Sequence, residues 1–207
     1  MKRFVLGTAI VAAAFVLMSC GASTTVQTMW KDDSFDPKET PFKKVFIMGV
    51  YQQQSSGLAF EAEMKKQFAA KGVEASGSLD YFKPGTEITK DELSAFVENN
   101  GYDAVLLSKL TDSQTKVDYH AGYSYGGYGG YYGAYRGAYG MYSSPGYVST
   151  YQIVNIETSL FSSAGEKLVW VGTSEIFDPS DVMDGIRSFA PTIVNELVNR
   201  KYFVRSK

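Results

Sequence analysis

One segment in the middle of the chain restricts how the rest can fold. Residues 120–147 read HAGYSYGGYGGYYGAYRGAYGMYSSPGY, with nine Tyr, nine Gly and Arg136 as the one full charge. This composition provides little aliphatic material for a core, and strand-like sequence lies on both sides. We therefore predict a long loop inserted in a β-hairpin. Lengthening such a loop from 4 to 28 residues costs only about 1.7 kcal/mol, so the remaining sequence must carry the fold.

The first twenty residues, MKRFVLGTAIVAAAFVLMSC, indicate export. Lys2 and Arg3 precede an apolar run that is shorter than the roughly 20 residues a spanning helix needs. The pattern is typical of a secretory signal peptide, and we expect residues 1–19 to be removed. Leu17-Met18-Ser19-Cys20 resembles the lipobox of bacterial lipoproteins.

The lipobox resemblance implies a covalent lipid. In that family the cysteine thiol receives a diacylglyceryl group, and its freed amine is usually acylated, for example with palmitate. Two or more acyl chains give stable membrane anchoring, so Cys20 is the expected lipid anchor. Gly21, rather than Asp, follows the cysteine. By resemblance to the enterobacterial sorting pattern, this residue implies the outer membrane, with the domain in the periplasm or at the cell surface.

The composition excludes several kinds of site. Cys20 is the only cysteine and His120 the only histidine. Zinc sites built from Cys and His are therefore excluded, as is a Cys–His nucleophile pair. The mature chain carries 18 basic against 22 acidic residues, a net charge near −4, and no basic cluster that would indicate nucleic acid as a partner. We expect no metal and no cofactor beyond the lipid on Cys20.

The first half of the mature chain predicts alternating strands and helices. We expect the lipidated cysteine and a flexible tether over residues 20–42, followed by a single α/β domain over residues 43–203. Apolar runs predict strands, and amphipathic stretches predict helices, with Thr89 and Glu92 forming a capping box. The expected elements are a strand at Lys43–Val50, a helix at Gly57–Lys71, a strand at Val73–Phe82, a helix after Thr89 that ends at Asn99–Gly101, and a strand at Ala104–Leu107. Such an order predicts a parallel sheet with right-handed crossovers.

The second half predicts antiparallel strands and a last helix. Gln114–Tyr119, Tyr147–Phe161 and Lys167–Phe177 are strand-like, and residues 161–166 are typical of a hairpin loop. The C-terminal helix is expected to use Asp178 as its N-cap, Pro179 at its first position and Asp181 in its first turn. Pro191 is expected to kink or split this helix. The predicted fold class is α/β (α+β) with a mixed sheet.

This order of elements resembles a broad class of bacterial envelope lipoproteins. Their domain is similar to the N-terminal domain of the translocation protein TolB and to lipoprotein activators of cell-wall synthases. Members of the class are mostly non-enzymatic partners in envelope assemblies. The resemblance covers residues 43–203 and rests on element order, without a fixed motif.

Three motifs that suggest chemistry have simpler explanations. Gly122–Gly126 matches the nucleophile elbow G-x-S-x-G, but Tyr/Gly repeats follow Ser124 where a helix is required, and His120 precedes it. The spacing of Asp178, Asp181 and Asp184 does not fit a calcium loop, and helix capping explains the first two. Glu157 and Glu175 are expected to be cross-strand or solvent-facing residues. We therefore predict a protein that is not an enzyme.

We interpret the chain as a non-enzymatic binding or assembly module for an envelope protein or glycan. Rings of low rotamer entropy favour a contact role for the Tyr/Gly loop. The loop could instead promote self-association, or be a surface insertion with no partner. An alternative function is regulation, in which the domain docks on a cell-wall synthase or other envelope enzyme and the loop is incidental. The candidate contact residues are Tyr123, Tyr125, Tyr128, Tyr131, Tyr132, Tyr135, Arg136, Tyr139 and Tyr142.

Overall fold

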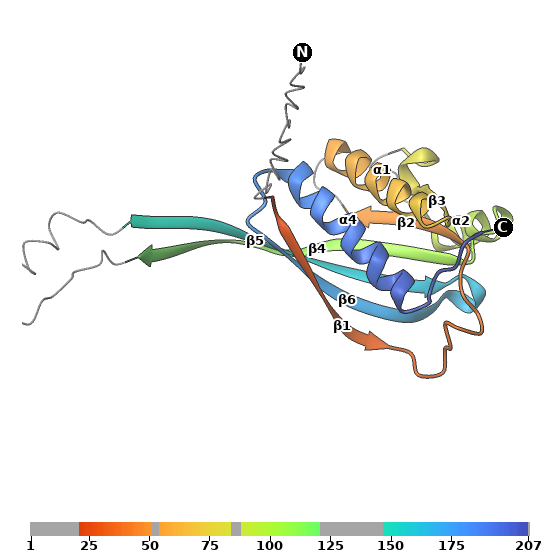
Figure 1. Ribbon diagram of the computed structural model, residues 1–207. Coiled ribbons are helices and arrows are strands. Elements are labelled where there is room, and N and C mark those ends of the chain that lie inside the picture. Colours follow the sequence, from red (N-terminus) through yellow and green to blue (C-terminus); the bar gives the residue numbers. More distant parts are fainter. Residues whose placement is uncertain (1–20, 51–53, 84–87, 121–146, 207) are drawn as a thin grey trace, which may run out of the picture.

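The computed structural model describes residues 21–50, 54–83, 88–120 and 147–206 (Figure 1). Its centre is a six-stranded mixed sheet with strand order β1-β6-β5-β4-β2-β3. Helices α1 and α4 pack on one face of the sheet, and α2 packs on the other face. The elements are β1 Ser23–Lys31, β2 Lys44–Val50, α1 Gln54–Ala70, β3 Glu74–Gly77, α2 Lys90–Asn99, β4 Ala104–His120, β5 Tyr147–Ser162, β6 Lys167–Phe177 and α4 Val182–Asn199. The predicted fold class is confirmed.

The first half forms the predicted parallel unit. β2 pairs in parallel with β3 on one side and with β4 on the other. The capping box is also confirmed: Thr89 Oγ1 accepts a hydrogen bond from Glu92 N at 3.3 Å, and Glu92 Oε2 accepts one from Thr89 N at 2.9 Å. These two bonds satisfy backbone donors that the start of α2 would otherwise leave free.

The strand predicted over residues 73–82 is shorter than expected. β3 ends at Gly77, and a 3₁₀ turn, Ser78–Asp80, follows it. Asp80 Oδ2 accepts a hydrogen bond from Gly77 N at 2.9 Å, which closes the turn. Phe82 then packs against Phe46 and Phe96 on the α2 side of the sheet. The alternating sequence pattern therefore continues past the point where the chain leaves the sheet.

The second half is antiparallel, as predicted, but its strands are longer. The two expected strands at Ala104–Leu107 and Gln114–Tyr119 are parts of one strand, β4, with a bulge between Leu110 and Asp112. β4 pairs with β5 along its whole length, and β5 pairs with β6. The hairpin between β5 and β6 closes near Gly165, whose φ of 73° suits glycine.

The flexible tether predicted over residues 20–42 is wrong for most of its length. Ser23–Lys31 forms β1, which pairs antiparallel with β6 at the edge of the sheet. Farther along, Phe35 stacks on Phe42 and Tyr202, with ring centroids 5.3 and 6.0 Å apart. The folded domain therefore begins near residue 22, because this segment supplies both a strand and core contacts.

The start of α4 also differs from the prediction. The N-cap is Asp181, whose side chain accepts a hydrogen bond from Asp184 N at 2.8 Å. Asp178 instead continues the pairing of the sheet: its N–H donates to Gln152 O at 2.7 Å, and its Oδ1 accepts from Gln152 N at 3.2 Å. The helix continues through Pro191 without being split.

The core lies between the sheet and the α1–α4 layer. Trp170 of β6 is its largest fully buried side chain, and its indole N–H donates to Thr28 Oγ1 of β1 at 3.2 Å. Most of α4's inward face is also fully buried, including Phe189 and Ile193. β1 therefore completes the wall around Trp170, which explains why this polar strand belongs to the domain.

Candidate functional site

A two-stranded arm extends from one end of the sheet (Figure 1). β2 pairs with β4 only as far as Lys109, and β6 pairs with β5 only as far as Ile153. Apart from the hydrogen bonds between Asp178 and Gln152 at the base, the six pairs from Thr115↔Gln152 to His120↔Tyr147 therefore have no third strand beside them among the described residues. At about 3.4 Å per residue, these pairs span roughly 17 Å. The arm, defined here as residues 115–120 and 147–152, carries the ends of the Tyr/Gly segment away from the domain.

The described side chains of the arm form no core of their own. Thr115, Lys116 and Val117 are exposed, and 65% of Val117 is accessible to solvent. An isolated two-stranded hairpin is at best marginally stable in water. Near the base of the arm, Tyr151 packs on Phe177 of β6 with ring centroids 5.0 Å apart. Among the described side chains of the arm, the packing against the domain is therefore at its base.

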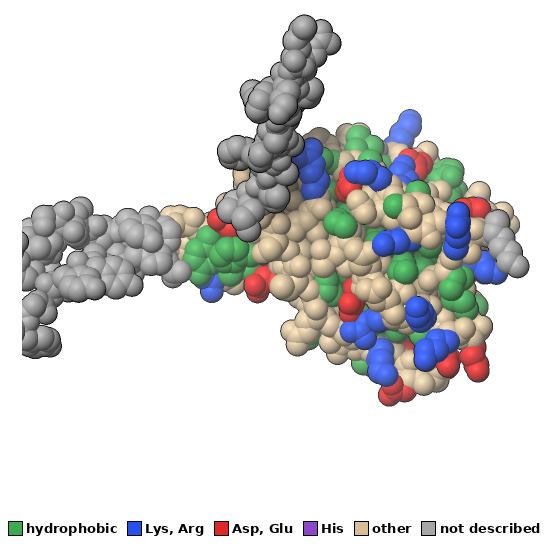
Figure 2. Space-filling model, in the orientation of Figure 1, with side chains coloured by type: hydrophobic (Ala, Val, Ile, Leu, Met, Phe, Trp, Pro, Cys, Tyr) green, Lys and Arg blue, Asp and Glu red, His purple; other side chains and the backbone are tan. Residues whose placement is uncertain are grey.

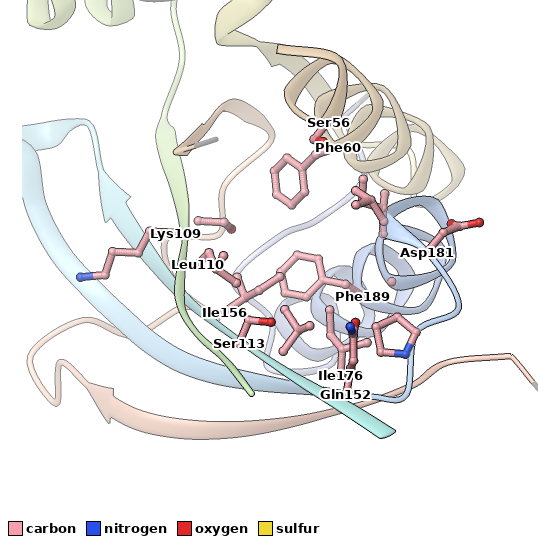
Figure 3. Close-up of a pocket in the computed structure, with 16 residues that line it drawn as sticks. Ser56, Phe60, Lys109, Leu110, Ser113, Gln152, Ile156, Ile176, Asp181 and Phe189 are labelled. Atoms are coloured by element: carbon pink, nitrogen blue, oxygen red, sulfur yellow. The ribbon is translucent and has the colours of Figure 1, made fainter. Parts of the chain in front are cut away.

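An apolar pocket of about 420 Å³ lies beside the base of the arm (Figure 3). It is bounded by β4, β5 and β6 below and by the N-terminal parts of α1 and α4 above. Its floor and walls are formed by Phe60, Leu110, Val154, Ile156, Ile176, Val182, Ile186 and Phe189. Pockets of 300–1,000 Å³ with mostly apolar walls are typical of ligand sites. An apolar side chain or small apolar molecule fits this lining.

Two of the polar side chains that line the pocket have partners within the protein. Lys109 Nζ forms an ion pair with Glu157 Oε1 across the strands at 2.8 Å, and Ser108 Oγ lies 3.0 Å from Thr158 Oγ1. Among the described residues that line the pocket, Asp181 is the only carboxylate, and it caps α4. This geometry favours binding of an apolar group over acid–base chemistry.

The most deeply buried carboxylate in the described structure lies elsewhere, on α1. Glu61 is 2% exposed and accepts hydrogen bonds from Ser78 Oγ at 2.6 Å and Leu79 N at 2.9 Å. Burial raises the pKa of Glu61 above its ordinary value, while the hydrogen bonds from Ser78 and Leu79 oppose that rise. Because both oxygens hold the turn after β3, we assign Glu61 a structural role.

The predicted site residues fall mostly outside the described ranges. Cys20, Ser124, all eight candidate tyrosines and Arg136 lie in segments that the structure does not describe. Of the residues it does describe, Glu157 pairs with Lys109 and Glu175 is exposed, as expected. Within the described ranges, no group of three or more His, Cys, Asp or Glu residues could hold a metal ion.

Sequence reasoning did not find the pocket, because its lining comes from five separate elements. Ile156 and Ile176 were expected in strands, and Ile186 and Phe189 on the apolar stripe of the last helix. These residues look like ordinary core positions in sequence. The pocket lies where β4 continues past its last pair with β2, beside the N-terminal parts of α1 and α4. Only the three-dimensional arrangement shows that these residues line a pocket.

In the described parts of the chain, no helix is both long and apolar enough to cross a membrane. No protein family matches the sequence, and no curated protein matches it. These comparisons therefore assign the chain to no family.

Several solved structures have a similar fold. They include the PelC dodecamer of Paraburkholderia phytofirmans, at TM-score 0.45 and 11% identity over 87% of this chain and 98% of that chain. The lipoprotein GNA1162 of Neisseria meningitidis has a TM-score of 0.41 and 13% identity over 75% and 99%. A Helicobacter pylori homologue of a neuraminyllactose-binding hemagglutinin has a TM-score of 0.38 and 14% identity over 79% and 88%. At such low TM-scores and identities, these similarities say nothing about the function of this chain.

Proposed function

We propose that this protein is a lipoprotein of the bacterial envelope that acts as a non-enzymatic binding or assembly module. The lipid on Cys20 anchors it, most naturally in the outer membrane, and the domain lies in the periplasm or at the cell surface. The observation that carries the binding role is the arm, which ends at His120 and Tyr147, the residues that flank the rest of the Tyr/Gly segment in sequence.

The energetics of the arm support this role. Ordering the backbone of each residue costs about 1–2 kcal/mol, and among the described residues no third strand or covering helix offsets that cost along the outer part of the arm. The arm residues whose side chains are described, 115–117 and 150–152, are not part of the buried core. We explain such an extended segment by its function, which is to contact a partner at a distance from the domain. Its strand-forming composition, with Thr115, Val117 and Thr150, keeps it extended.

The Tyr/Gly segment supplies the expected contact chemistry. Tyrosine combines a large apolar ring with a hydroxyl and loses little rotamer entropy on binding. The proposed contacts are the eight tyrosines from Tyr123 to Tyr142 together with Arg136. An envelope protein or a glycan is the expected partner, because a mildly acidic chain without a basic cluster has no feature suited to nucleic acid.

Cross-linking in cells tests the binding role. A photo-cross-linking residue at Val117 on the arm is expected to capture a partner in the wild-type background. Deletion of residues 121–146 should abolish that product while leaving the melting temperature of the domain unchanged. A matched variant keeps the loop length but replaces its tyrosines with serine, and should also lose the product. The same cross-linker at Glu98, near the opposite end of the sheet, serves as control. A product that survives both loop variants contradicts the proposal.

The anchor needs a separate test. Cys20→Ser should remove incorporation of labelled palmitate and release the protein from the membrane fraction. Incorporation that persists in this variant, or a wild-type chain that takes up no label, would refute the lipid anchor. Neither result depends on what the arm binds.

The pocket favours one alternative, in which the domain itself docks on a cell-wall synthase or other envelope enzyme. An apolar side chain of such an enzyme could fill the cavity beside Ile156 and Phe189. In that case the domain lacking residues 121–146 should still change the rate of the enzyme. Filling the cavity with Gly185→Leu should then remove the effect.

A further inference from the structure

We propose that the end of the domain from which β1 emerges rests directly on the bilayer. The contact surface is an anchor-proximal patch formed by Phe177, Val182 and Met183. This inference depends on the proposed lipid at Cys20, but it concerns how the domain sits on the membrane. It replaces the expected tether, which would have held the domain roughly 25 Å away.

The chain is fixed to the domain almost as soon as it leaves the anchor. Ala22 N donates a hydrogen bond to Asp184 Oδ2 at 3.2 Å, and Thr24 Oγ1 lies 2.7 Å from Ser188 Oγ on α4. One residue, Gly21, separates Ala22 from Cys20. Because an extended residue spans at most about 3.6 Å, a lipid on Cys20 begins within roughly 7 Å of Ala22.

Exposed apolar side chains lie on both sides of this exit point. Phe177 is opposite Ser23 in the sheet and is 45% exposed. Val182 and Met183, in the first turn of α4, are 59% and 37% exposed. Three of the nine exposed large hydrophobic residues in the described ranges therefore lie at this end. Figure 2 shows hydrophobic side chains gathered where the arm leaves the domain.

Apolar groups beside a lipidation site are suited to the interfacial region of a bilayer. Binding there increases with the apolar area that enters the boundary between headgroups and acyl chains. Singly scattered exposed hydrophobic residues need no explanation, whereas exposed apolar side chains on both sides of one exit point suit a contact surface. Tyr151, which packs on Phe177, adds a ring of the kind that is enriched at membrane interfaces.

The charges around the patch indicate which lipids suit it. Asp178, Asp181 and Asp184 surround Val182 and Met183, and all three accept backbone hydrogen bonds. The N–H of Ser180 helps to hold the pKa of Asp184 below its ordinary value, so this group is charged at neutral pH. Arg187 also acts on the Asp184 carboxyl, but three carboxylates against one guanidinium leave this end net negative, so anionic headgroups would be repelled. The patch therefore suits a zwitterionic surface such as phosphatidylethanolamine.

This orientation also positions the arm. Phe177 pairs with Ile153, which immediately follows Gln152 at the base of the arm, so the arm leaves the domain from the membrane-facing end. The opposite end, where Ala104 pairs with Ser162, faces away from the bilayer. Contacts of the arm are therefore expected close to the membrane surface.

The test uses the lipidated full-length chain, reconstituted into phosphatidylethanolamine–phosphatidylcholine vesicles. Because Cys20 is the only native cysteine, Met183→Cys introduces a single reactive thiol for an environment-sensitive fluorophore. Val182→Cys provides a second position, and Glu98→Cys near the far end of the sheet is the matched control. We expect quencher-labelled lipids to reduce emission at least twofold at residues 182 and 183, with no change at residue 98.

Each other outcome has a defined meaning. If the chain floats with the vesicles but neither residue 182 nor residue 183 is quenched, the inference is overturned and the lipid anchor stands. If the chain does not float with the vesicles, both the anchor and the inference fail. If emission at these positions is already shifted in detergent, and energy transfer between copies accompanies it, the patch contacts a second copy and the inference is overturned.

Discussion

Glu61 shows how one buried charge can be satisfied by local structure. It lies on α1, faces the turn after β3, and accepts hydrogen bonds from the Ser78 hydroxyl and the Leu79 amide. Gly77 leaves the space that Glu61 occupies, because a Cβ there would overlap the Glu61 carboxyl group. Desolvation raises the pKa of Glu61 above 4.5 in the folded state. The folded chain therefore keeps this proton to a higher pH than the unfolded chain does.

This difference predicts a pH-dependent stability. The contribution of Glu61 to the free energy of unfolding falls as pH rises through its raised pKa. Glu61→Gln cannot ionise, so its stability relative to wild type should increase from pH 4 to pH 8, as measured by urea denaturation. Glu63→Gln, on the same helix, is the control. Its pKa is lowered by the Gln67 side chain, so that variant should lose relative stability over the same range. Parallel trends in the two variants would contradict the assignment.

The sequence did not distinguish these two glutamates. Glu61 and Glu63 both lie in a stretch where apolar and charged residues are interleaved, and neither has a spacing that marks it as buried. The difference arises because the chain after Gly77 turns back over α1. Local cap signals were more informative: Thr89 and Glu92 sit at the spacing of a capping box, whose geometry depends on nearby residues alone.

At the scale of elements, β1 is the clearest departure from the prediction. Its sequence, STTVQTMWK, lacks an apolar run, and we expected a tether there. An edge strand needs only one half-buried face, which Thr24, Val26 and Thr28 supply at alternate positions. This period-two pattern of β-branched residues was the available signal. It was weak, because the partner strand β6 lies more than a hundred residues away in sequence.

The packing of β1 on β6 can be tested at Gly172. A Cβ at this position would overlap the Trp170 ring and lie 3.2 Å from the Gln27 carbonyl oxygen of β1. Because β1 prevents the ring from moving outward, Gly172→Ala should lower the free energy of unfolding by about 1–3 kcal/mol. Gly185→Ala, in α4, meets only ordinary contacts of 3.5 Å and longer. In that control, the free energy of unfolding should stay unchanged or rise by up to about 1 kcal/mol.

Thermal and urea denaturation of both variants provide the measurement. If Gly172→Ala is as stable as wild type, the ring of Trp170 can relocate, and β1 does not cover it as the structure shows. Loss of stability in Gly185→Ala alone would also reverse the expected order.

At the scale of the whole molecule, two long strands connect a packed domain to an exposed arm. β4 and β5 have 17 and 16 residues, against a usual strand length of about five or six. Their inner halves lie between other strands and under the helices, whereas no described strand or helix lies beside their outer pairs. The sequence indicated strands on both sides of the Tyr/Gly segment, but not that they would form one continuous ribbon. The apolar periodicity is interrupted between Lys109 and Gln114, so the two parts of β4 read as separate elements.

This architecture predicts a gradient of stability along single strands. Hydrogen exchange reports local opening, which requires less free energy where few buried contacts hold the backbone. Amides of the arm, for example Lys116 and Thr150, should exchange at least a hundredfold faster than those of Leu106 and Leu160 in the same two strands, both of which are fully buried. Exchange measured by NMR or mass spectrometry on the purified chain checks this expectation. Deleting residues 121–146 should leave the slow amides unchanged, because the domain does not draw its stability from the arm. Equal protection along the whole of β4 would instead mean that contacts beyond its own two strands hold the arm. It would then contradict our argument that the arm extends in order to contact a distant partner.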